Sequence, residues 1–168
     1  PSRHAAVPWA KIFRDRNILL LMLMYHCYCW GAYFYLSWLP TYLQLGRRLT
    51  EDQMKFASSL PPAAGLIGVM AGGYLSDRLV RRHSLRFARC SIGTASLLGS
   101  GILMAVATVT PNAWAAVAAI SVGLGVMNGM LPVSWALCVD LGREHSGAVS
   151  ATMNTAGQLG SHDRREGR

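Results

Sequence analysis

The sequence predicts an all-α protein that crosses a membrane several times. Only 14% of its 168 residues are charged and 52% are hydrophobic. Long uncharged stretches alternate with short charged ones: thirty residues between Arg16 and Arg47, twenty-one between Lys55 and Asp77, and fifty between Arg89 and Asp140. A helix needs about twenty predominantly apolar residues to cross roughly 30 Å of hydrocarbon. These stretches therefore supply one, one and two crossings, in a polytopic bundle of helices.

The basic residues predict the orientation of the chain. The formal net charge of +8 comes from sixteen Lys and Arg against eight acids, and these residues gather at the ends of the apolar runs. They are not interleaved with exposed aromatics, so we expect a membrane topology signal and no binding of nucleic acid. Segments 1–16, 76–89 and 140–146 carry ten Lys and Arg, whereas 46–55 and 110–112 carry three. By the positive-inside rule, we expect a multi-pass protein of the plasma (inner) membrane with a cytoplasmic N-terminus.

A juxtamembrane segment precedes the first predicted span. Residues 1–16 hold four basic residues and one acid, as expected for a cytoplasmic approach to the bilayer. The span, residues 17–43, is rich in Tyr, Trp and Phe. Near its far end Pro40 removes a backbone donor, so we expect the helix to kink or end there.

The second and third predicted spans, residues 56–75 and 90–109, both carry small side chains. Such residues let membrane helices approach closely. In the second span the small residues are Gly65, Gly68, Gly72 and Gly73; in the third they are Gly93, Ser96, Gly99, Ser100 and Gly101. We expect the pair Pro61–Pro62 to break the first turns of the second span.

The fourth predicted span, residues 113–139, combines several glycines with Pro132. This combination predicts a second half that is bent and partly unwound, as is tolerated where a helix lines a cavity. Residues 147–160 predict the start of a fifth helix that is incomplete. The remaining residues, 161–168, are hydrophilic and form a separate tail.

Patterns of a catalytic or metal site are absent from the sequence. Its four cysteines lie in or beside apolar runs, without the spacing of a disulfide framework or a zinc site: Cys27, Cys29, Cys90 and Cys138. The sequence lacks a Gly-rich phosphate loop, a nucleophile elbow and paired carboxylates within a span. We therefore expect a protein that is not an enzyme and that needs neither a metal nor a cofactor.

A glycine and arginine motif follows the second span, between residues 72 and 86. Two glycines precede an acid and a run of arginines, in the order Gly-x-Leu-Ser-Asp-Arg-x-x-Arg-Arg-x-x-Leu. This order resembles the inter-helix loop signature of the major facilitator superfamily of secondary transporters. The residues that carry it include Gly73, Asp77, Arg78, Arg81 and Arg82, and Val80 stands where the family usually has a second glycine. The resemblance implies that these residues form a loop that helps to hold a closed cytoplasmic gate; a plain positive cytoplasmic loop is the alternative.

Two further stretches resemble one branch of that superfamily, the anion:cation symporters. Residues 25–43 are similar to the seventh transmembrane helix of that family, and residues 147–160 are similar to the start of its eleventh. The resemblance implies that the chain holds helices seven to ten and the opening of eleven, which is a C-terminal half. We therefore expect a fragment of a longer transporter that lacks its N-terminal half.

The resemblance also implies a function. Members of the family move organic anions such as sugar acids and other carboxylates, usually coupled to protons. Secondary transport in this class needs two helix bundles rocking about a site between them, so we expect this chain alone to be inactive. One alternative is a small membrane scaffold, or a subunit that pairs with a separate N-terminal half. An integral membrane enzyme is a third, weaker alternative.

Five residues are candidates for binding the solute. Tyr25 and Tyr28 share a helix face, where their hydroxyls can donate to an anion; internal packing of that face explains them equally well. Trp135 follows the proline break with an indole donor. Asn154 and Gln158 lie four residues apart, and amides within a span seek hydrogen-bond partners on a ligand or on another helix.

His26 lies within the first span and is a candidate proton relay. A neutral histidine bonded to a neighbouring helix is the stronger alternative.

Overall fold

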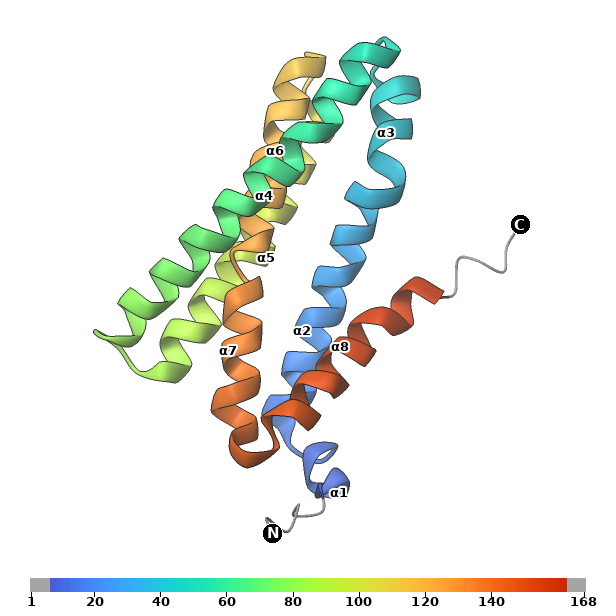
Figure 1. The fold of residues 1–168 in the computed structure, drawn as a ribbon. Coiled ribbons are helices and arrows are strands. Elements are labelled where there is room, and N and C mark those ends of the chain that lie inside the picture. The colour runs from blue at the N-terminus through green and yellow to red at the C-terminus, as the bar shows by residue number, and fades with distance from the viewer. Residues whose placement is uncertain (1–6, 163–168) are drawn as a thin grey trace. The chain divides into compact units, whose positions relative to one another are not determined.

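The structure, a computed structural model, describes residues 7–162, and over this range every regular element is a helix (Figure 1). The all-α prediction is therefore confirmed. Four helical stretches are long and apolar enough to cross a membrane: Arg16–Gly46, Glu51–Val80, Leu85–Val109 and Ala113–Leu159. The predicted juxtamembrane segment and hydrophilic tail lie partly outside the described residues. The chain forms two compact units, one with the residues up to Trp30 and from Ser134 on, the other with Gly31–Val133.

The first membrane-capable stretch is helical throughout but not uniformly α-helical. Helix α2, Arg16–Tyr33, is followed by a π-helical turn η1, Phe34–Trp38, then by α3, Leu39–Thr41, and a second π-helical turn η2, Tyr42–Gly46. Pro40 therefore does not end the helix. It lies between the two π-helical turns. Their wider hydrogen-bonding pattern tolerates a residue that has no amide hydrogen to donate.

Helix α4, Glu51–Val80, begins with a capping box. The Thr50 hydroxyl accepts from the Gln53 amide, and the Gln53 side chain accepts from the Thr50 amide. The expectation that Pro61–Pro62 break the first turns is wrong, because α4 is continuous through both prolines. Local adjustments of the backbone accommodate proline within membrane helices.

Helices α4 and α5 extend beyond the predicted spans. Helix α4 includes the predicted 56–75 and continues to Val80, and α5, Leu85–Val109, begins five residues before the predicted 90–109. The Ser84 hydroxyl caps α5 by accepting from the Phe87 amide at 3.3 Å. The predicted spans stop at the charged residues, whereas the helices begin where their caps lie.

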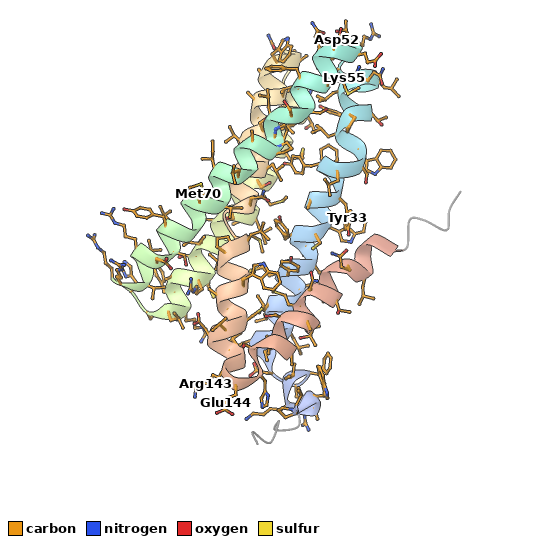
Figure 2. The ribbon with its side chains drawn as sticks, viewed as in Figure 1. Tyr33, Asp52, Lys55, Met70, Arg143 and Glu144 are labelled. Carbon is orange, nitrogen blue, oxygen red and sulfur yellow. The ribbon has the colours of Figure 1, made fainter. Side chains whose placement is uncertain are left out.

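Helices α4 and α6, Ala113–Asn128, cross within the second unit, and α5 packs against α6 (Figure 1). The side chain of Asn112 caps α6 by accepting from the amides of Trp114 and Ala115. Several large apolar residues of α4 are exposed, including Leu66 and Ile67. Met70 is another, and Figure 2 labels it on α4. Such residues suit contact with lipid.

The predicted break in the fourth span is present, but it lies at Gly129 and Met130, ahead of Pro132. Helix α7, Leu131–Gly142, begins after these two residues and places Pro132 in its first turn. The missing amide hydrogen of a proline there removes no intrahelical bond. The interruption therefore comes from the glycine turn.

The first unit contains α1, Trp9–Ile12, most of α2, most of α7, the short 3₁₀ turn η3, Arg143–His145, and α8, Ser146–His162. Arg143 has a positive φ of 48° where the chain turns from α7 into α8. Helix α8 includes the predicted helix start at 147–160.

Candidate functional site

An aromatic cluster in the first unit brings together three of the predicted solute-binding residues. Tyr25 and Tyr28 lie one turn apart on α2 with ring centroids 5.6 Å apart. Trp135 of α7 meets the Tyr25 ring edge-on, at 6.5 Å between centroids. Both tyrosines are buried, whereas Trp135 is 44% exposed. The cluster therefore presents an indole at its surface, with two phenol rings behind it.

Helix α8 packs tightly against α2 at Gly157. A Cβ atom at Gly157 would lie 2.8 Å from Cys29 Sγ and 2.8 Å from Tyr25 Cδ1. A side chain at this position would collide with both, so the close approach requires glycine. The packing places the backbone of α8 directly beside the aromatic cluster.

His26 makes a second link between these two helices. Its Nδ1 lies 2.8 Å from the carbonyl oxygen of Ala156, so Nδ1 is the donor and carries the hydrogen. This arrangement matches the alternative considered from the sequence, a histidine bonded to a neighbouring helix. Its role in holding α8 against α2 gives His26 a structural explanation that needs no proton relay.

The two predicted amides lie on a different face of α8. Asn154 and Gln158 are both exposed, whereas Met153 and Gly157, the residue before each of them, are buried. Successive helix residues point about 100° apart, so the amides lie beside the face that meets α2. The structure thus gathers Tyr25, Tyr28 and Trp135, whereas Asn154 and Gln158 lie on an exposed face of α8.

A buried sulfur contact completes this unit, and sequence reasoning missed it. The Cys138 thiol donates to the Met153 thioether at 3.5 Å, and both side chains are fully buried. Cys138 follows Trp135 by three residues, so the two residues lie on neighbouring parts of one α7 face. No pattern in the sequence pairs Cys138 with Met153, because the contact depends on how α7 and α8 pack.

The five predicted gate residues lie in the second unit, and only two of them lie in a loop. Gly73, Asp77 and Arg78 belong to the last turns of α4, whereas Arg81 and Arg82 form the turn before α5. Among the described residues the Asp77 carboxylate has neither an ion-pair nor a hydrogen-bond partner, and it is exposed. It is therefore available to groups beyond this chain.

Two contacts near these residues were not predicted. Arg89 of α5 donates to the buried hydroxyl of Ser76 at 2.5 Å, which ties the start of α5 to the end of α4. Arg78 lies 3.3 Å from the Tyr74 hydroxyl, one turn back on the same helix. Arg89, just after the motif, thus fastens the two helices, whereas the motif arginines Arg78, Arg81 and Arg82 are exposed.

The family model of the Major Facilitator Superfamily matches residues 1–161. The chain belongs to the Major Facilitator Superfamily. The probable sulfoacetate transporter of Cupriavidus necator is 35% identical over 152 residues, which cover 90% of this chain and 35% of the relative. The probable galactarate/D-glucarate transporter of Bacillus subtilis is 31% identical over 157 residues, 92% of this chain and 34% of the relative.

A third relative, the hexuronate transporter of Bacillus subtilis, is 25% identical over 162 residues, 92% of this chain and 38% of the relative. This superfamily member thus spans about a third of the length of these curated relatives. These matches confirm the family that was predicted from the arginine motif and from residues 25–43 and 147–160. They also make the chain a multi-pass integral membrane protein.

The aromatic cluster of this superfamily member carries a few polar groups at the edges of its rings. They are two phenol hydroxyls and an indole N–H, groups that form hydrogen bonds. Among residues 7–162, three or more His, Cys, Asp or Glu side chains nowhere gather in a way that can hold a metal ion.

Proposed function

We propose that this chain is part of a secondary active transporter for a small organic anion, a sugar acid or another carboxylate. The observation that carries the proposal is the set of relatives, whose names specify transport of sulfoacetate, galactarate or D-glucarate, and hexuronate. These solutes share a small size and a carboxylate group. A common site chemistry for such anions is expected within one family branch.

The aromatic cluster supports the proposal. Trp135 offers a partly exposed indole that carries one N–H donor, and the Tyr25 and Tyr28 rings supply apolar surface with hydroxyl groups at their edges. Neutral donors bind a carboxylate without forming a full ion pair, so the solute can leave again. Asn154 and Gln158 add amide groups on the neighbouring face of α8.

We also propose that transport is coupled to a proton and that the N-terminus is cytoplasmic. Coupling to a proton rests on the resemblance to the anion:cation symporters. The excess of basic residues in segments 1–16 and 76–89 supports a cytoplasmic N-terminus in a plasma membrane. Alternating access needs two bundles, so the transport activity is proposed for the assembly that this chain forms with an N-terminal half, and the chain alone is proposed to be inactive.

Transport in a chimaera tests this function. The chain replaces the segment that it matches in the probable sulfoacetate transporter of Cupriavidus necator, and the product is reconstituted in proteoliposomes. We expect uptake of at least one of sulfoacetate, galactarate and hexuronate, faster with an inward proton gradient, and no uptake by the 168-residue chain alone. Correct insertion of the chimaera without uptake of any of the three solutes would overturn the proposed function. Uptake that does not respond to the proton gradient would exclude coupling to a proton.

Single substitutions then test the site. In the chimaera, Trp135→Ala and Asn154→Ala should each weaken substrate binding. The affinity is measured by displacement of a labelled solute. Ser100→Ala is the control, because Ser100 lies in the other unit and is buried. Small effects of equal size for all three variants would remove Trp135 and Asn154 from the site.

A further inference from the structure

Arg47, directly after the second π-helical turn, connects the end of the first membrane-capable stretch to another helix of the same unit. Its Nη1 donates to the carbonyl oxygen of Thr110 at 2.6 Å, and its Nη2 donates to the carbonyl oxygen of Ala107. Its Nε donates to the Tyr42 hydroxyl at 2.8 Å, and the guanidinium carbon lies 5.4 Å from the centre of the Tyr42 ring. One half-buried side chain therefore makes three hydrogen bonds and a cation–π contact.

The two carbonyl oxygens belong to the end of α5, and the sequence explains why they need a donor. In a helix that continued past Val109, the Ala107 carbonyl would accept from the amide of residue 111. Residue 111 is Pro111, which has no amide hydrogen. The last carbonyls of a helix also carry partial negative charge, and the planar guanidinium fork can reach two of them together. Arg47 thus supplies the donors that α5 lacks at its end.

The position of Arg47 depends on the π-helical turns before it. Its own amide bonds to the carbonyl oxygen of Tyr42, five residues back, at 3.1 Å. A π-helical turn holds one more residue than the α-helical bonding pattern does, and each residue of an α-helix turns the chain by about 100°. Loss of one residue from η2 would therefore swing the side chain of Arg47 away from α5.

The backbone beyond Arg47 also holds this geometry. Arg48 has a φ of 54°, the left-handed conformation that ends helices, and the Leu49 amide then bonds to the carbonyl oxygen of Leu43 at 3.2 Å. The next helix begins two residues later, at Glu51. The turn between the two helices is thus fastened on both sides of Arg47.

We propose that Arg47 is a latch, which locks the end of the first stretch to the carboxyl end of α5 and holds the π-helical register of residues 42–46. Opening the latch lets this segment relax toward an α-helical register. The lock itself does not depend on transport. Its release during a transport cycle rests on the proposed function.

Hydrogen exchange of the full chain in lipid nanodiscs, followed by mass spectrometry, tests the latch. Arg47→Lys keeps the charge but loses the fork, and we expect exchange at the end of α5, residues 106–110, and in residues 42–47 to rise at least tenfold. Arg48→Lys is the matched control, because Arg48 is adjacent and exposed, and it should leave both segments unchanged. Equal exchange in Arg47→Lys and Arg48→Lys would overturn the latch.

Tyr42→Phe keeps the test decisive if Arg47→Lys does not fold, and deletion of Leu45 tests the link between register and latch. Tyr42→Phe removes one of the three bonds and should raise exchange in the same two segments by a smaller factor. Deletion of Leu45, an exposed residue of η2, should match Arg47→Lys, and adding Arg47→Lys to the deletion should have no further effect. Additive effects would overturn the link between register and latch.

The exchange result stands apart from the proposed function. In the transport chimaera, Arg47→Lys should change the rate of solute uptake and leave solute affinity unchanged. If no variant transports, the proposed function fails. The exchange data still show whether Arg47 locks the end of the first stretch to α5. If the chimaera transports and Arg47→Lys has the rate of Arg48→Lys, the release step is overturned.

Discussion

The backbone of Gly68 in α4 packs directly on the backbone of Gly125 in α6. A Cβ atom at Gly68 would overlap the carbonyl group of Gly125, and the same is true one turn further on for Gly72 and Gly129. Two pairs of glycines, each four residues apart, thus form the crossing of the two helices. Membrane helices associate by such close backbone packing, because lipid provides no hydrophobic drive between them.

Replacing Gly68 by alanine should therefore separate α4 from α6. We expect Gly68→Ala to lower the free energy of unfolding by roughly 1–3 kcal/mol, as overpacking of a close contact does. The measurement is denaturation in detergent micelles followed by circular dichroism. Gly101→Ala is the control, because nothing lies within 4 Å of a Cβ at Gly101, and it should be neutral or slightly stabilising. Equal losses in both variants would contradict the close contact.

A similar test addresses the first unit. Gly157→Ala would push α8 away from Cys29 and Tyr25, and we expect a loss of roughly 1–3 kcal/mol together with a changed fluorescence of Trp135. Gly147→Ala, with nothing within 4 Å of its Cβ, is the control on the same helix. An unchanged stability and spectrum for Gly157→Ala would show that α8 does not pack here.

The exposure of Asp77 leads to a prediction that separates stability from transport. Because its carboxylate has no partner among the described residues, Asp77→Asn should leave the thermal unfolding of this chain unchanged. In the transport chimaera the same change should slow uptake with normal insertion, since the carboxylate is proposed to hold a gate with groups of an N-terminal half. Uptake at the normal rate would exclude a gating role.

The topology of α8 is a further prediction. The helix has 17 residues, which extend about 26 Å, short of the roughly 30 Å hydrocarbon core. It carries several polar side chains that oppose insertion into lipid: Ser150, Thr152, Asn154, Thr155 and Gln158. We therefore expect α8 not to cross the membrane in this chain, so a reporter fused after Arg168 should be active in the cytoplasm.

Two reporters separate the possible outcomes for α8. Adding an apolar continuation after Gly160 should silence the reporter after Arg168. If the unmodified chain instead places that reporter outside the cytoplasm, either α8 spans or the orientation is inverted. A second reporter in residues 47–55 decides between these, because only inversion would move it into the cytoplasm.

Long uncharged runs in the sequence predicted the four membrane-capable stretches, whereas the predicted spans began later than helices α4 and α5 do. Helices α4, α5 and α6 begin at Thr50, Ser84 and Asn112, because each of these side chains accepts a hydrogen bond from a backbone amide two or three residues later. The proline signals were less reliable. Pro61–Pro62 and Pro40 lie inside continuous helical stretches, because neighbouring backbone adjusts around them. Three of the five candidate solute residues, Tyr25, Tyr28 and Trp135, do meet, whereas Asn154 and Gln158 lie on another face of α8.

The sequence by itself determined that this protein is a helical membrane protein of its superfamily, because uncharged runs long enough to cross a bilayer and a charged motif between them are properties of adjacent residues. The tertiary structure alone decided which helix faces meet. Arg47 and Ala107 are sixty residues apart, and Gly68 and Gly125 are fifty-seven apart. Their contacts depend on how α4, α5 and α6 pack, and that packing depends on backbone approaches and helix register, which no local pattern specifies.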